Sequence, residues 1–366
     1  MVNHDGPTHR RTAVDSLTPL LLRALSRGYR LADLRRRHSN EARLTRQCRS
    51  GFYDDVWAEA AASVDGRVSR LGSLTEIECG GIRLRVRDNL TSLDDAVTLQ
   101  VAGDKPLVYQ LLQAEGIRVP AHVVCAACDL AIARRFLQQT GRPCVVKPAR
   151  RTGAGVGITT GLRDLAQLVA ALVRAGAYCG EVVVEEQVDG QNLRLLYLDG
   201  EFLDSVRRLP PVVCGDGRSR ISELIERENA DRLAKGCAAS QTLLVVDAEL
   251  RGTLRGEGYT MRSVPAAGEV VRLKGVVNDN RGEDNVAVDG LCSAVVEVGA
   301  RAAAAVGVRL AGVDVITPDP TRPLDEVGGV IIEVNTTPGY YYHYQKRDGR
   351  VPVATMILER LVKAAK

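Results

Sequence analysis

Lysine is scarce in this sequence, and three of its lysines stand where a phosphate group could be bound. Only seven of the 49 basic residues are Lys, and the others are Arg. Lys147 and Lys274 each end an apolar stretch, and Lys105 begins a segment with helical spacing. The compact ammonium of Lys makes point contacts with phosphate oxygens, whereas the planar guanidinium of Arg favours paired contacts. The placement of these lysines therefore predicts phosphate binding.

A glycine-rich segment follows Lys147 closely. It consists of Thr152, Gly153, Ala154, Gly155, Val156 and Gly157. Alternating glycines leave a flexible loop whose N–H groups can face an anion. Two common phosphate-binding patterns fail, because position 158 is Ile and no Lys-Ser/Thr pair follows the loop. A simple β-turn would explain the loop about as well, and its place after Lys147 is what favours phosphate binding.

Oxygen ligands for a cation occur far downstream. Asp314 lies in an apolar strand-like run, and Glu333 and Asn335 lie two residues apart in the next one. Residues two apart on a strand point to the same face. Three oxygen donors of this kind suit Mg²⁺. Glu333 and Asn335 could equally belong to an edge strand, but a buried Asp314 without a partner would be very costly.

A third segment has the character of an adenine-binding hinge. The apolar run 182–184 leads into Glu185, Glu186, Gln187 and Val188. Adenine has apolar faces and one polar edge, so a strand that runs into a hinge can offer it a backbone C=O and N–H between aliphatic walls. A buried strand with a polar end is the common alternative.

In the elements that must position these residues, predicted helices and strands alternate at first, and strands form hairpins later. Helices are predicted over 17–37, 104–116, 129–140, about 162–172, 220–229 and 291–306. Strands are predicted over 121–124, 144–147, 181–186, 193–199, 202–208, 269–274, 309–316 and 329–335. Residues 1–12 resemble a disordered tail, and residues 40–103 give weaker signals for short mixed helices and strands. This order predicts a mixed α+β protein with more than one sheet.

Composition excludes several classes of protein. The net charge is +4 with both signs interspersed, and aromatic residues make up 4%, so nucleic-acid binding is not expected. No apolar run is long enough to span a membrane, and the polar start does not resemble a signal peptide. Nine cysteines without a repeating pattern suggest reduced thiols. We therefore expect a cytoplasmic protein.

Several separated motifs together resemble the ATP-grasp ligases and, among them, the ATP-grasp module of cyanophycin synthetase. The stretch 311–335, followed by Pro338-Gly339, carries the resemblance most clearly. Asp104-Lys105, the run 145–148, the segments 184–194 and 208–217, and Gly258–Thr260 with Ser263–Pro265 add to it in the same order. The likeness covers roughly residues 100–345, and motifs in the right order are more specific than any single one.

The resemblance implies an ADP-forming ligase that joins a carboxylate to an amine through an acyl phosphate, with ATP and Mg²⁺. It implies that Lys105 and Lys147 hold phosphates, that residues 152–157 form a flap and that 185–188 bind adenine. Asp314, Glu333 and Asn335 would hold Mg²⁺, while Arg208 and Lys274 would have catalytic roles. The implied substrate-binding residues are Arg194, Arg208, Thr336, Gly339 and His343. Arg194, Arg207 and Arg208 suggest an anionic or amino-acid substrate.

The sequence departs from the family at two places. Asn192 stands where an acidic ribose-binding residue is expected, and residues 277–285 are more polar and acidic than in the family. Cyanophycin synthetase also carries a Mur-ligase-like domain and a larger N-terminal region. We therefore expect a free-standing ligase for amino acids or peptides, and a homodimer by analogy with the family. A small-molecule kinase and a catalytically dead nucleotide-binding protein are the alternatives.

The expected architecture is an α+β ATP-grasp fold in which ATP is held between two α+β subdomains. Residues 1–104 would form an N-terminal lobe before it. Residues 105–182 would form the small or lid subdomain, and residues 183–366 the large subdomain with the metal and substrate site.

Overall fold

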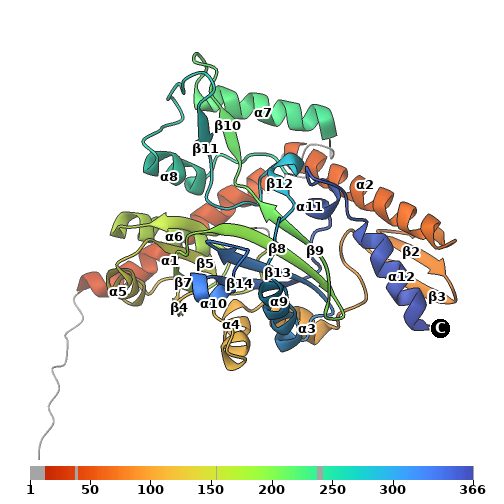
Figure 1. Ribbon diagram of the computed structural model, residues 1–366. Helices are drawn as coiled ribbons and strands as arrows, with labels where there is room; N and C mark the ends of the chain where they lie inside the picture. The colour runs from red at the N-terminus through yellow and green to blue at the C-terminus, as the bar shows by residue number, and fades with distance from the viewer. Residues whose placement is uncertain (1–12, 38–39, 154, 237–241, 366) are drawn as a thin grey trace, which may run out of the picture.

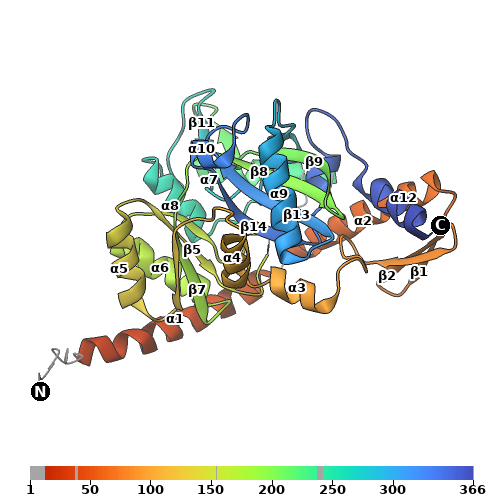
Figure 2. The same cartoon turned by 60° about the horizontal axis from the view of Figure 1, so that its bottom comes forward.

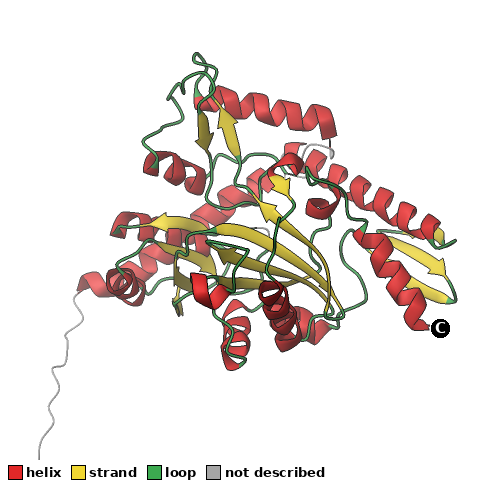
Figure 3. Cartoon of the chain, in the orientation of Figure 1, coloured by secondary structure: helices red, strands yellow, loops and turns green. Residues whose placement is uncertain are grey.

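The computed structural model describes residues 13–37, 40–153, 155–236 and 242–365. The described strands form four sheets, of three, two, five and four strands, and helices cover them (Figures 1 and 3). All strand pairs within these sheets are antiparallel. The predicted α+β fold class is confirmed. None of the described helices is both long and apolar enough to cross a membrane.

The N-terminal lobe consists of two long helices and a three-stranded sheet. Its elements are α1 (Ala13–Arg37), α2 (Asn40–Ser63), β1 (Arg67–Leu71), β2 (Leu74–Cys79) and β3 (Ile82–Val86). The helix predicted over 17–37 is confirmed as part of α1. The segment predicted as a disordered tail lies outside the described residues.

The prediction of only short elements after residue 40 is wrong, because residues 40–63 form the single helix α2. Its buried residues Tyr53, Val56, Trp57 and Ala60 have helical spacing, but they occupy only its C-terminal half. The first half is polar, which weakened the periodic signal. These residues pack with α12 (Val353–Ala365) in one hydrophobic cluster.

The four-stranded sheet forms a lobe of its own, with strand order β4-β7-β5-β6. Its strands are β4 (His122–Ala126), β5 (Cys144–Pro148), β6 (Thr159–Leu162) and β7 (Glu181–Glu186), and its helices are α5 (Leu130–Thr140) and α6 (Leu165–Gly176). Asp129 caps the start of α5, and Gly141 ends it in the left-handed region at φ 62°. Helix α1 runs along this lobe and contacts α6 (Figure 2).

The five-stranded sheet is the centre of the molecule, with strand order β12-β9-β8-β13-β14. Its strands are β8 (Gln191–Leu198), β9 (Glu201–Arg208), β12 (Asn285–Val286), β13 (Leu310–Thr317) and β14 (Val330–Thr336). One face carries Leu195 and Val313 and is covered by α3 (Ala96–Ala102), α4 (Lys105–Ala114) and α9 (Ser293–Val306). Because side chains alternate along each strand, the intervening residues, such as Arg194 and Asp314, face the other side.

A smaller unit joins the central sheet. It contains β10 (Val212–Cys214), β11 (Val270–Arg272), α7 (Ile221–Lys235) and α8 (Ala248–Gly256), which share a hydrophobic cluster. The remaining short helices are α10 (Leu324–Val327), α11 (Tyr341–Tyr344) and a 3-10 turn at Gly282–Asp284. Figure 1 shows this unit above the central sheet, on the side away from α4 and α9.

The boundary predicted between residues 182 and 183 falls inside β7. The hydrogen bonds of β7 tie its residues to β4 and β5, so residues 183–186 group with the four-stranded sheet. Helix α4, predicted as part of the lid, packs against α9 of the central sheet.

The cysteines follow the expectation of reduced thiols with one exception. Within the described residues, seven are free: Cys79, Cys125, Cys128, Cys144, Cys179, Cys214 and Cys292. Cys48 is disulfide-bonded, so the expectation is wrong at that position.

Candidate active site

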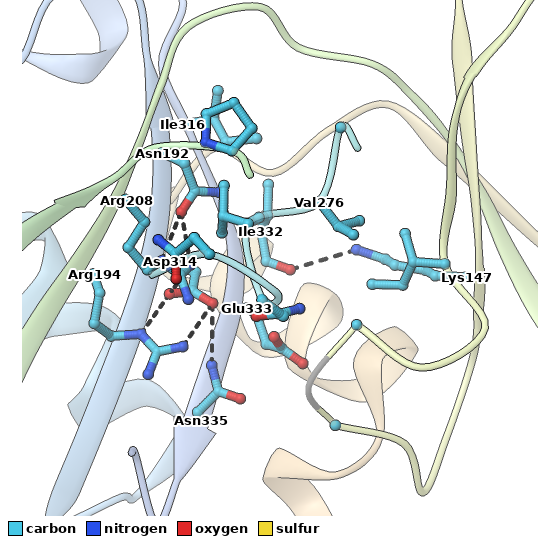
Figure 4. Close-up of a pocket in the computed structure, with 18 of the residues that line it drawn as sticks. Lys147, Asn192, Arg194, Arg208, Val276, Asp314, Ile316, Ile332, Glu333 and Asn335 are labelled. Atoms are coloured by element: carbon cyan, nitrogen blue, oxygen red, sulfur yellow. Dashed lines mark hydrogen bonds and ion pairs between the residues drawn. The ribbon is translucent and has the colours of Figure 1, made fainter. Parts of the chain in front are cut away.

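A cavity of about 840 Å³ is lined by both the four-stranded and the five-stranded sheet. It brings together most of the predicted site residues. These are Lys105, Lys147, Thr152, Gly153, Gly155, Val156, Glu185, Glu186, Gln187, Val188, Asn192, Arg194, Arg208, Asp314, Glu333, Asn335, Thr336 and Gly339. Figure 4 shows Lys147 on one side of the cavity and Asp314, Glu333 and Asn335 on the other. Lys147 and Asn335, which are almost 190 positions apart in the sequence, thus line the same cavity.

Lys147 is a buried ammonium held in place by neighbours. Its Nζ lies 2.8 Å from Glu185 Oε2 and donates to Tyr109 Oη at 2.7 Å. The Tyr109 hydroxyl lies 2.8 Å from Glu185 Oε2 and 3.1 Å from the carbonyl oxygen of Ile332. Burial, reinforced by the charge of Glu185, raises the pKa of Tyr109 well above its usual value, so the hydroxyl stays neutral. This network fixes the position of a cation at the cavity wall.

Lys105 connects the glycine-rich loop with the central sheet. It begins α4 directly after the capping residue Asp104, whose side chain accepts a hydrogen bond from the N–H of Leu107 at 3.1 Å. The Lys105 Nζ donates to the carbonyl oxygen of Thr152 at 3.3 Å and lies 3.3 Å from Glu333 Oε1. A second buried cation therefore faces the same space from another element.

Asp314 forms a buried charge network with two arginines. Arg194 donates to both of its carboxylate oxygens, at 2.5 and 3.0 Å, and Arg208 Nη2 lies 3.0 Å from Oδ1 (Figure 4). Burial by itself raises the pKa of Asp314, but the two guanidinium groups outweigh it and hold the pKa below its usual value. Arg208 also donates to Asn192 Oδ1, at 2.6 and 3.0 Å. Asn192, predicted to contact ribose, is thus the partner of Arg208 in this structure.

The three predicted metal ligands lie next to one another on β13 and β14. Asp314 is the cross-strand partner of Glu333, and Asn335 is the partner of Gly312. The Asn335 amide nitrogen donates to the carbonyl oxygen of Gly312 at 3.3 Å and to Asp314 Oδ2 at 3.4 Å, which leaves its own carbonyl oxygen for a cation.

The donor set formed by these residues fits Mg²⁺. Glu333 and Asn335 offer oxygens toward the cavity, and the Glu333 side chain is 26% exposed. Both oxygens of Asp314 already accept hydrogen bonds, so Asp314 would have to exchange an arginine bond to bind the ion directly.

The predicted hinge is held in place by backbone hydrogen bonds. The N–H of Glu186 donates to the carbonyl oxygen of Ala121 at 2.9 Å, and the N–H of Gln187 donates to that of Pro143 at 2.8 Å. Gln187 Oε1 accepts from the N–H of Gly161 at 2.7 Å. The N–H groups of Glu186 and Gln187 therefore already donate hydrogen bonds. The polar edge of adenine would have to form its hydrogen bond with the backbone at another position, such as Val188.

The glycine-rich loop covers one side of the cavity. Thr152, Gly153, Gly155 and Val156 line it, and Ala154 lies outside the described residues. Gly155 has φ +70°, and a Cβ there would meet the Asn278 side chain at 2.3 Å. Gly157 does not line the cavity, because it packs against Pro148 and Tyr178.

Besides Gly157, two other predicted residues of the described ranges lie outside the cavity lining. Lys274 is buried, and its Nζ lies 2.6 Å from Asp279 and 3.3 Å from Asp247. His343 is fully buried, and its Nδ1 lies 2.7 Å from Asp204 Oδ2. The structure therefore places both beside other charged groups and not among the cavity-lining side chains.

Sequence reasoning missed several residues that build the site. Tyr109, which does not line the cavity but binds Lys147, lies four positions after Lys105 on α4, and this helical spacing was a signal that both side chains lie on one face. Arg49 and Asn89 come from the N-terminal lobe, where no motif marks them.

Comparison with known proteins supports one family. The model of the C-terminal region of D-Ala-D-Ala ligases matches residues 111–208. Cyanophycin synthetase from Trichormus variabilis is 31% identical over 279 residues, which cover 75% of this chain and 31% of that protein. The glutathione biosynthesis bifunctional protein GshAB from Streptococcus mutans is 30% identical over 262 residues, which cover 70% of this chain and 34% of that protein.

A solved structure agrees with these relatives. The crystal structure of a bifunctional glutathione synthetase from Pasteurella multocida aligns with a TM-score of 0.52 and 24% identity, over 82% of this chain and 42% of that one. The chain belongs to the ATP-grasp ligases. The ATP-grasp fold predicted from the sequence is therefore confirmed. This ATP-grasp chain spans about a third of the length of the relatives it matches.

Proposed function

We propose that the protein is an ATP-dependent, ADP-forming ligase that joins the carboxylate of an amino acid or peptide to an amine. The observation that carries this proposal is the shared cavity: Lys105 and Lys147 line it together with Asp314, Glu333 and Asn335. Two cations and three oxygen donors around one space suit a triphosphate with its magnesium ion.

In this proposal each wall of the cavity has its own role. Lys105 and Lys147 bind phosphate oxygens, and the loop 152–156 lies over them. Residues 185–188 receive adenine at the end of β7. Glu333 and Asn335 hold Mg²⁺, with Asp314 beside them, and the ion neutralises phosphate charge when it is bound.

The reaction would have two chemical steps. A carboxylate oxygen of the first substrate attacks the γ-phosphorus of ATP, the bond to the bridging oxygen breaks, and ADP leaves. The amine nitrogen of the second substrate then attacks the acyl carbon, phosphate leaves, and the nitrogen loses a proton as the amide forms. Arg208, which lines the cavity, would neutralise charge that develops on the transferred group.

Product analysis tests the proposal. Purified protein is mixed with ATP, Mg²⁺ and pairs of amino acids, and we expect ADP, phosphate and a new amide to appear together. Lys147→Ala should abolish their formation, whereas Lys235→Ala, which changes an exposed lysine on α7, should not. AMP with pyrophosphate would contradict the acyl-phosphate route, and a stable phosphorylated product without an amide would identify a kinase.

Two further features belong to the proposal. A cytoplasmic location agrees with the lack of a membrane-spanning helix among the described residues. Besides ATP and Mg²⁺, the protein would bind small amino acids or peptides, and a second copy of the chain would form a homodimer with it. Light scattering of the purified protein tests the homodimer directly.

A further inference from the structure

The cavity extends past the predicted metal ligands toward the N-terminal lobe. Ile332 on β14 contacts Lys147, Glu333 and Asn335 follow it, and Thr337 comes just after the strand. Five residues of extended chain span roughly 17 Å, so the end of the cavity at Thr337 is far from Lys147. This distance leaves room beyond the phosphates for a second substrate.

The far end of the cavity is built partly from the N-terminal lobe. Arg49 of α2, Tyr53 of α2 and Asn89 after β3 line it together with Thr337. Arg49 Nη2 donates to Asn89 Oδ1 at 2.7 Å, and the Asn89 amide nitrogen donates to the carbonyl oxygen of Thr337. Asn89 is 8% exposed, so this amide is a fixed link between Arg49 and the end of β14.

Thr337 has an unusual backbone conformation. Its φ is +49°, in the left-handed region that a β-branched residue rarely adopts. Strained residues of this kind persist only where the surroundings hold them, and they cluster at functional sites. The hydrogen bond from Asn89 supplies one such restraint, which points to a ligand-binding role for this end of the cavity.

Arg49 carries a charge that no neighbouring carboxylate neutralises. Across the described ranges, with their gaps, no Asp or Glu forms an ion pair with Arg49, whereas Asp314 pairs with both Arg194 and Arg208. The guanidinium lies over the ring of Tyr53, 5.7 Å from its centroid, and its side chain is exposed. An oriented, unpaired guanidinium at a cavity wall suits a carboxylate, which it can bind through two N–H groups.

We propose that Arg49, positioned by Asn89, binds a free carboxylate of the amine substrate. This inference rests on the proposed ligase function. Lys105, Lys147 and the metal ligands surround the proposed phosphate site, so the amine would reach a face of the acyl group from the remaining part of the cavity, on the Thr337 side. Asn335 and Thr337 are about 7 Å apart along an extended chain. A dipeptide can cover this span between its reacting nitrogen and its carboxylate, and so can an amino acid that carries one of these two groups on its side chain. The second substrate is therefore an amino acid or a peptide with a free carboxylate.

A competition experiment tests this specificity. Each amino acid in turn serves as acyl donor, with ATP and Mg²⁺. The acceptors are an equimolar pool of the amino acids and of the same amino acids with every carboxylate converted to a carboxamide. Mass spectrometry gives the ratio of products from free-acid and carboxamide acceptors. We expect the wild type to favour the free acids at least tenfold, and Arg49→Ala to bring the ratio close to one.

Matched variants separate specificity from damage to the fold. Arg49→Lys keeps the charge and should give an intermediate ratio. Arg43→Ala changes an exposed arginine of α2 that does not line the cavity, and it should behave as the wild type. The KM for ATP should change less than twofold in Arg49→Ala, because Lys105 and Lys147 are untouched.

The possible outcomes separate the two proposals. Equal use of acids and carboxamides by the wild type, or an unchanged ratio in Arg49→Ala, would overturn the role of Arg49 while amide formation still supports the ligase. If no amide and no ADP form with any donor and either class of acceptor, the ligase proposal itself fails, and this inference fails with it.

Discussion

Two buried charge networks of similar composition lie in different parts of the molecule. In the central sheet, Asp314 is paired with Arg194 and Arg208. Between α6 and the β10–β11 unit, Asp247 is paired with Arg174 at 2.8 Å and with Lys274 at 3.3 Å. In both networks the cations hold the pKa of the aspartate below its usual value, although burial alone would raise it.

The networks differ in what surrounds them. Arg194, Arg208 and Asp314 line the cavity, whereas Arg174, Asp247 and Lys274 do not. The second network joins separate units: Arg174 comes from the four-stranded lobe, and Asp247 caps α8. Glu249 of α8 adds to this connection by accepting from the hydroxyl of Thr160 on β6 at 3.4 Å. The same residue types therefore line the cavity at one place and attach two units of the chain at the other.

Asp314→Asn should have the largest effect, because it removes a carboxylate that pairs with both Arg194 and Arg208. We expect the free energy of unfolding to fall by about 3–5 kcal/mol, the usual cost of leaving buried charges unpaired. Turnover should fall by roughly 10²–10³-fold or more. Urea unfolding and ADP release measure the two effects. Asp319→Asn, in the exposed turn after β13, should preserve turnover, and full activity of Asp314→Asn would exclude Asp314 from the mechanism.

Glu333→Gln should separate activity from stability within the cavity. The Glu333 side chain is 26% exposed, so losing its charge should cost about 1 kcal/mol or less. Turnover should still fall by roughly 10²-fold, with a higher Mg²⁺ concentration needed for half-maximal rate. Magnesium titrations of ADP release test this, with Glu326→Gln of α10 as the control. An unchanged magnesium dependence would remove Glu333 from the ligand set.

Lys274→Met tests whether the second network is structural. In this variant Asp247 still pairs with Arg174. We therefore expect the free energy of unfolding to fall by about 2–3 kcal/mol, which is less than the usual cost of a buried charge that has no partner. Turnover at saturating ATP should stay within about tenfold of the wild type, and the exposed Lys235→Met should change neither quantity. The opposite result, unchanged stability with turnover lowered more than 100-fold, would support the catalytic role predicted from the sequence.

His343 should give the smallest effect, visible as a dependence of stability on pH. Burial lowers the pKa of His343 against the opposing effect of Asp204, so the folded protein binds this proton less readily than the unfolded chain. Stability should therefore fall as pH drops below about 6.5, by up to about 1.4 kcal/mol per pH unit. Urea unfolding between pH 7.5 and 5.5 should show a shallower slope for His343→Gln than for the wild type or His122→Gln. Equal slopes would contradict a buried neutral imidazole.

Local signals predicted much of the fold from residue 104 onward. The capping residues Asp104 and Asp129, and Gly141 after α5, mark helix ends through contacts with their own chain neighbours. Such signals do not depend on distant residues. They were weaker in α2, whose buried aromatic stripe packs against α11 and α12 near the other end of the sequence. The long helix was therefore missed.

In the candidate site, too, some features follow from neighbouring residues and others only from contacts between distant segments. Glu333 and Asn335 could be placed on one face because strand geometry fixes the orientation of residues two apart. Nothing near Lys274 in the sequence indicates that Asp247, 27 positions earlier, is one of the two carboxylates paired with its ammonium. Arg49 likewise reaches the cavity only because the fold brings the N-terminal lobe to the end of β14, where Asn89 binds both Arg49 and Thr337.

The sequence by itself determined the types of the reactive groups, the order of the elements that carry them, and the face of each strand on which they lie. These follow from backbone geometry and from interactions between near neighbours, which act before the chain is compact. The tertiary structure alone decided which lysines line the cavity and which lies outside it, and which cavity arginines have no carboxylate partner among the described residues. Those outcomes depend on charges brought within a few ångströms of each other by packing between distant segments, where electrostatic interactions become strong.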